Sequence, residues 1–142
     1  LKKPVLYLSD FFEKNRKLYY ENLTIVREKN DLSQWFKFFL VGIIETAKNG
    51  ILTFDNIMQL QKTTEKDIQG LKSRAANAKK IVDYLYKRPV INAEKISEIA
   101  GISMPSSYKL IMELERMNIL KEITGGQRGR MYQHENYLKL FR

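Results

Sequence analysis

Two short amphipathic segments on either side of Gly101 constrain the fold of this chain more than any other feature. Residues 93–100 and 104–117 each repeat apolar side chains at helical spacing, so their apolar faces can be buried together. Asn92 and Ser103 are suitable N-caps, and Gly101 suits the left-handed conformation that ends the first helix. The spacing predicts a helix-turn-helix that buries Ile96, Ile99, Ala100, Ile102, Leu110, Ile111 and Leu114.

Further elements on both sides of this unit complete a domain. We expect a helix, a short extended piece, two strands and a last helix at residues 75–85, 90–91, 120–124, 130–134 and 137–141. Pro89 ends the first of these helices, because proline cannot continue a helix. Gly125 and Gly129 flank the loop between the strands. This order is typical of a winged helix-turn-helix domain with a two- to three-stranded β-wing, which we expect over residues 71–142.

The first half of the chain is expected to be helical, so the whole protein should be mainly α. Aromatic side chains recur at helical spacing in residues 11–23 and 35–43 and should form a core. Asn30-Asp31 should separate these two helices. Asn49-Gly50 should end or weaken the second helix, since glycine costs about 1 kcal/mol against alanine inside a helix. A third helix should begin near residue 55, and the polar residues 62–73 are expected to be a solvated helix or linker.

Charge is unevenly distributed along the 142 residues. Of the net charge of +9, residues 1–70 carry +2 and residues 71–142 carry +7. A basic half attracts polyanions such as DNA or RNA, although the same charge can serve solubility alone. The sequence has no cysteine, which excludes disulfides. Its longest apolar run is far shorter than the about 20 residues that span a bilayer, and no secretory pattern is present, so we expect a cytoplasmic protein without a membrane partner.

The second helix of the helix-turn-helix carries the first group of candidate contacts. Its buried stripe is expected to comprise Ser107, Leu110, Ile111 and Leu114. The opposite face then presents Ser106, Tyr108 and Lys109 near the amino end, where such helices reach base edges. Lys109 can meet a phosphate or a guanine edge, and the two hydroxyl groups can donate hydrogen bonds to either. Few arginines and asparagines lie on this face, so strong sequence specificity is not expected.

The glycine-flanked loop carries the second group, Gln127, Arg128 and Arg130. Two arginines and a glutamine on a flexible hairpin suit contact with phosphates or insertion into a minor groove. The alternative is an ordinary hairpin whose arginines are solvated. Given the helix-turn-helix before it, we favour a wing that contacts nucleic acid.

No catalytic or metal site is expected in this chain. The single histidine, His134, is predicted on the strand after the loop, where such residues are usually exposed or half-buried, and no acidic cluster stands near it. Gly125-Gly126 lacks the lysine and helix of a phosphate-binding loop. Glu113 and Glu115 fall on different helix faces. We therefore expect no metal, no cofactor and no enzymatic activity.

The first half of the chain resembles a known family. The resemblance rests on residues 4–12 (PVLYLSDFF), 15–16, 19–20, 23, 26–27, 35, 38–40 and 42. These are similar to the part of Fic-domain proteins that follows their catalytic motif. Many members of that family also carry a winged helix at the carboxyl end, as residues 92–120 suggest here. The resemblance implies an incomplete domain of Fic-type helices over residues 1–70.

Fic proteins use a motif of the form His-Pro-Phe-x-x-Gly-Asn-Gly-Arg to move AMP from ATP onto a hydroxyl group of a target protein. The sequence does not contain this motif, so none of the family's catalytic roles can be placed on a residue here. The resemblance implies that the chain is the tail of a protein adenylyltransferase and is inactive alone. ATP and Mg²⁺ would belong to the part upstream of Leu1.

Three functions are compatible with the sequence. The leading hypothesis is DNA binding by a winged-helix tail, in a regulatory role. The alternative is a protein docking or dimerisation module, which presents targets to the Fic catalytic domain or restrains it. A third is a purely structural tail that completes the enzyme's fold. The DNA site, the protein target and the oligomeric state stay open.

Overall fold

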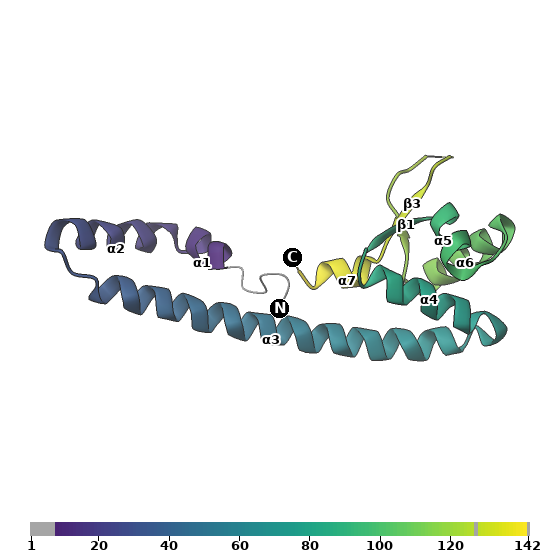
Figure 1. Cartoon of the computed structure of the whole chain (residues 1–142), viewed down its shortest axis with the longest axis horizontal. Helices are drawn as coiled ribbons and strands as arrows, with labels where there is room; N and C mark the ends of the chain where they lie inside the picture. Colours follow the sequence, from purple (N-terminus) through teal and green to yellow (C-terminus); the bar gives the residue numbers. More distant parts are fainter. Residues whose placement is uncertain (1–7, 127, 142) are drawn as a thin grey trace. The chain divides into compact units, whose positions relative to one another are not determined.

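The computed structural model describes residues 8–126 and 128–141 (Figure 1). Helices make up 74% of the structure, and the strands form one three-stranded antiparallel sheet. The expectation of a mainly helical protein with a small sheet is therefore confirmed. The chain divides into two compact units, Leu1–Asp55 and Asn56–Arg142. Gln127 and residues 4–7 of the family resemblance lie outside the described residues.

The first unit contains α1 (Leu8–Lys14), α2 (Arg16–Lys29) and the first part of α3 (Ser33–Gln69). We predicted one helix where the structure has α1 and α2. The helices divide at Asn15, whose side chain donates a hydrogen bond to the Phe11 carbonyl (2.9 Å) instead of pointing to solvent. Asn30 ends α2 in the left-handed conformation, with φ of 52°, so the predicted break at Asn30-Asp31 is confirmed.

The core of the first unit is small and aromatic. Phe11 and Phe38 are buried, with ring centroids 5.2 Å apart, and join α1 to α3. Half-buried Tyr19 of α2 packs against Trp35 of α3 at 5.4 Å. Gly42 lies directly under Phe11, because a Cβ there would be 2.6 Å from the ring. The aromatic core is thus confirmed only in part. Two residues of the predicted apolar face, Phe36 and Leu40, are exposed at 57% and 55%.

Helix α3 runs without a break for 37 residues. Of the two outcomes left open at Asn49-Gly50, the structure excludes an end of the helix, and the predicted separate start near Asp55 is wrong. One glycine can weaken a helix without stopping it. Of the two alternatives for residues 62–73, a solvated helix or a linker, the helix is found up to Gln69. Most of this segment is exposed, but Thr64 and Ile68 are buried at 3% exposure in the second unit. The domain boundary at residue 70 stays a prediction. None of the described helices combines the length and the apolar character needed to cross a membrane.

The second unit contains the predicted order of elements after the end of α3. These are η1 (Lys72–Arg74), α4 (Ala75–Leu85), β1 (Val90–Asn92), α5 (Ala93–Ala100), α6 (Met104–Arg116), β2 (Lys121–Glu122), β3 (Met131–Gln133) and α7 (Glu135–Lys139). The sheet order is β1-β3-β2, and Tyr132 lies opposite both Ile91 and Glu122. The two later strands are shorter than predicted. The last helix, predicted over residues 137–141, is found at Glu135–Lys139, so Phe141 lies beyond it and is 56% exposed.

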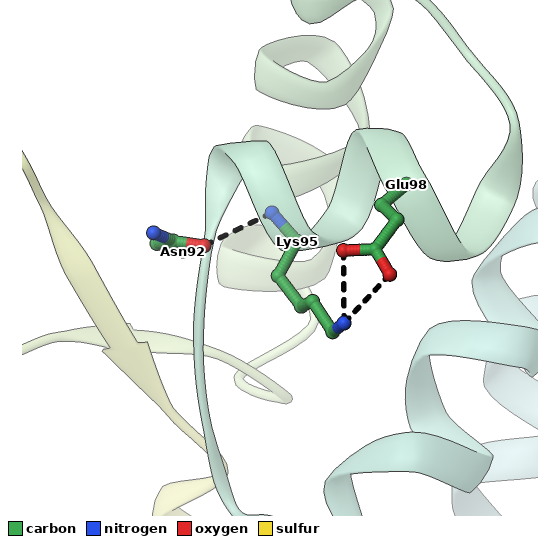
Figure 2. A network of polar contacts seen from close by, with 3 residues as sticks. All are labelled: Asn92, Lys95 and Glu98. Atoms are coloured by element: carbon green, nitrogen blue, oxygen red, sulfur yellow. Dashed lines mark hydrogen bonds and ion pairs between the residues drawn. The ribbon is translucent and has the colours of Figure 1, made fainter.

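Local signals fix the helix-turn-helix. The Asn92 side chain accepts a hydrogen bond from the Lys95 backbone amide (2.9 Å) and caps α5 (Figure 2). Figure 2 also shows the Lys95 ammonium group bound to the Glu98 carboxylate at 2.8 Å, one turn later. Gly101 ends α5 with φ of 64°. Ser103 precedes α6 as predicted, but its hydroxyl lies 3.0 Å from the Ser106 hydroxyl and makes no capping bond to the backbone.

One continuous core holds the second unit together. It takes side chains from α3 to α6, from the sheet and from the segment between α6 and β2, namely Ile68, Ala78, Ile81, Val82, Leu85, Ile91, Ala93, Ile96, Ala100, Leu110, Ile111, Leu114, Ile119, Leu120 and Tyr132. Ile99 and Ile102 pack against it half-buried. The predicted buried stripe of α6 is confirmed: Ser107, Leu110, Ile111 and Leu114 are all at most 2% exposed.

Candidate nucleic-acid interface

Burial of one α6 face decides which side chains the other face presents. Ser106, Tyr108 and Lys109 are all exposed in the first turns of the helix. Tyr108 is 48% exposed. Pro105 lies in the first turn, where its missing N–H leaves no helical hydrogen bond unmade. The three candidate residues are therefore placed as the spacing predicted, while their role stays a prediction.

The loop between β2 and β3 is shaped by its own hydrogen bonds. The Glu122 carboxylate accepts bonds from the backbone amides of Thr124 (2.7 Å) and Gly125 (2.9 Å) and from the Thr124 hydroxyl. These bonds favour the charged carboxylate and lower the pKa of Glu122. Gly125 and Gly129 both have positive φ, 65° and 64°, at the two sides of the loop. These bonds and glycines shape a hairpin in the described residues before and after Gln127.

Arg130 closes this hairpin. Its Nε donates a hydrogen bond to the Gly126 carbonyl (2.8 Å), across the loop. The sequence predicted only that Arg130 contacts nucleic acid. The bond to Gly126 could not be predicted, because it depends on the geometry of the turn. Arg128 is exposed at the tip. The predicted Gln127 contact lies outside the described residues.

The helix and the loop meet at one hollow of about 260 Å³. Tyr108 of α6 lines it from one side, and Gly129 and Arg130 line it from the loop. Ala93 and Glu94, at the start of α5, complete the lining. The structure therefore brings Tyr108 and Arg130 together, although they are far apart in sequence. Ser106, Lys109 and Arg128 are exposed but do not line this hollow.

The three basic candidate residues differ in ion pairing from other basic residues of the second unit. Arg74, Lys79, Lys95, Lys121 and Lys139 form the ion pairs of the second unit. Lys109, Arg128 and Arg130 take part in no ion pair with any residue that the structure describes. Their charges are therefore free to attract an anion. Glu94 opposes this attraction locally, because its carboxylate lies at the hollow.

His134 departs from its predicted environment. It follows β3 and precedes α7, but it is fully buried, against rings of Tyr86 (centroids 5.5 Å apart) and Tyr137 (5.9 Å). Neither ring nitrogen has a hydrogen-bond partner among the described residues. Burial lowers the pKa of His134 to about 4; the nearby Ile119 backbone opposes this shift without reaching hydrogen-bond geometry. A neutral histidine out of reach of solvent is unsuited to acid-base catalysis.

Comparison of the sequence with known proteins does not place the chain in a family. Within residues 8–126 and 128–141, no group of three or more histidine, aspartate or glutamate side chains is arranged to hold a metal ion. No model of a protein family matches the sequence, and no curated protein matches it.

Proposed function

We propose that the second unit is a winged helix-turn-helix domain that binds duplex DNA through α6 and the β2–β3 loop. The single observation that carries the proposal is the hollow that Tyr108 of α6 and Arg130 of the loop both line. In a winged helix the recognition helix and the wing contact the same duplex, so both must open onto one surface. The order of elements and the buried stripe of α6 also support this assignment.

Each contact follows from the chemistry of the exposed side chains. The amino end of α6 would enter the major groove, which is wide enough to admit a helix. There Lys109 would contact a phosphate or a guanine edge, and Ser106 and Tyr108 would donate hydrogen bonds. Arg128 and Arg130 would contact phosphates or the minor groove from the loop. The Nε of Arg130 would at the same time hold the loop in shape through its bond to the Gly126 carbonyl. Gln127 is proposed from its sequence position alone.

Affinity in this proposal comes mainly from phosphate contacts. Arginine and asparagine read purines with pairs of hydrogen bonds. The exposed face of α6 has neither residue near its amino end and carries one lysine among its candidate residues. Weak sequence preference and strong salt dependence follow. We further propose, from the resemblance of the first half, that the domain is the regulatory tail of a Fic-type AMP-transferring protein.

Protein docking is the competing function, and one observation favours it. Tyr108 and Met112 lie one turn apart on α6 and are 48% and 53% exposed. Large apolar side chains at this spacing are the anchors of helix-mediated protein contacts. In that case α6 would present targets to the enzyme or restrain it.

Salt dependence separates the two functions. Fluorescence anisotropy would measure binding of the whole chain to a mixed-sequence duplex between 50 and 200 mM salt. If Lys109, Arg128 and Arg130 each neutralise one phosphate, the slope of log affinity against log salt is about −2.7, which is about a 40-fold loss over this range. A chain that binds no duplex even at 50 mM salt would rule out DNA binding and leave docking as the function.

A further inference from the structure

The first unit leaves one face of α3 bare. Phe36, Leu40, Ile44, Ile51 and Phe54 are between 53% and 63% exposed. The side chains that hold α1 and α2 against α3 lie on a different face of the helix, which carries Trp35, Phe38 and Gly42. Isolated apolar residues are normal on a protein surface, but a contiguous row of this size marks an interaction site.

This bare face has the spacing of a coiled-coil seam. Leu40, Ile44, Ala47, Ile51 and Phe54, which we call the α3 seam, follow one another at intervals of 4, 3, 4 and 3 residues. Such intervals mark the a and d positions of a heptad, where side chains face a partner helix. Isoleucine occupies both a positions and leucine the first d position, a combination that favours two-stranded assemblies. The seam therefore fits one partner helix of similar kind.

We propose that two copies of this chain associate through their α3 seams. Charge favours a second copy in particular. The chain carries +9 overall and repels itself, but residues 38–54 contain one acid, Glu45, and one base, Lys48, and are neutral. Two seams can therefore meet without the like-charge repulsion that the rest of the surface would cause.

The available area and the weak core support the same conclusion. Half-exposed side chains of this size present on the order of 100 Å² each, so Phe36 and the large residues of the seam offer about 1,000 Å² in two copies, enough for a specific interface. Phe11 and Phe38 are the buried apolar residues in the described part of the first unit. Such a small core leaves three helices weakly held, and a second copy would enlarge it.

Neighbouring residues on α3 provide a matched pair of variants. Ile51 and Leu52 are 63% and 60% exposed, but consecutive residues point about 100° apart around a helix, so Leu52 lies off the seam. Sedimentation equilibrium of the whole chain should give twice the chain mass of 16.8 kDa. Ile51→Asp should weaken association about 100-fold or more, because it would bury an unpaired carboxylate. Leu52→Asp should leave it unchanged.

Two results would overturn the proposal. One is a wild-type chain that stays monomeric at every concentration measured. That result would assign the seam to another protein or segment. The other is equal weakening by Ile51→Asp and Leu52→Asp, which would show association without use of the seam. Circular dichroism would verify that each variant is folded. If Ile51→Asp is not folded, association of Ile44→Gln would be measured in its place. Unchanged association of Ile44→Gln would also contradict the proposal.

Discussion

Acidification should destabilise the second unit through His134. Burial lowers the pKa of this histidine from 6.5 to about 4 in the folded state, so between these values the unfolded chain binds more protons. The free energy of unfolding therefore falls as the pH falls through this window. The contribution of neutral His134 to the free energy of unfolding is fully present above pH 6.5 and is fully lost below about pH 4. Lowering the pKa by about 2.5 corresponds to about 3.4 kcal/mol at most.

Urea unfolding of wild-type and His134→Leu chains at pH 7.5 and pH 4.5 would measure this effect. Leucine is similar in size, does not titrate, and removes two ring nitrogens that have no hydrogen-bond partner in the described structure. The wild type should lose about 2–3 kcal/mol more than the variant between these pH values. The pKa of the adjacent Glu135 is lowered to about 2, chiefly by its bond to Lys121, but this carboxylate is common to both chains and cancels. An equal loss in both chains would refute the account of His134.

Three further outcomes are expected. Leu114→Ala should reduce stability by about 2–5 kcal/mol, because Leu114 is fully buried between α6 and its neighbours; an unchanged thermal melt would mean that α6 faces the other way. Gly42→Ala should destabilise the first unit by about 1–3 kcal/mol, since its Cβ would lie 2.6 Å from the Phe11 ring, whereas Gly50→Ala, with open space around it, should not. The purified chain should transfer no labelled AMP from ATP to itself or to other proteins, and transfer above background would contradict the proposal that it lacks the catalytic part.

Short-range signals predicted the second unit well. Asn92 caps α5 and Gly101 ends it because each signal acts through the backbone of a few adjacent residues. The buried stripe of α6 followed from periodicity for the same reason. Local rules were less successful in the first unit. Asn49-Gly50 left open whether the helix would end or only be weakened, and α3 continues through both residues, because the preference of one residue is small beside the helix that surrounds it.

Features that depend on distant contacts could not be predicted. Phe36 and Leu40 have the spacing of core residues, and only the positions of α1 and α2 show that they stay exposed. His134 is buried because the end of α4 and α7 place Tyr86 and Tyr137 against it. The exposure of Tyr108 followed from the spacing, but its meeting with Arg130 at one hollow depends on the arrangement of the loop and α6.

The salt dependence of DNA binding in one pair of charge variants tests the central proposal most directly. Arg128→Ala removes an exposed charge from the loop, and Lys80→Ala removes one from α4, outside the proposed interface. Anisotropy titrations with one duplex should show the slope of log affinity against log salt falling from about −2.7 to about −1.8 in Arg128→Ala and remaining unchanged in Lys80→Ala. Equal slopes in all three chains would contradict the assignment of the loop and α6 as the DNA-binding surface.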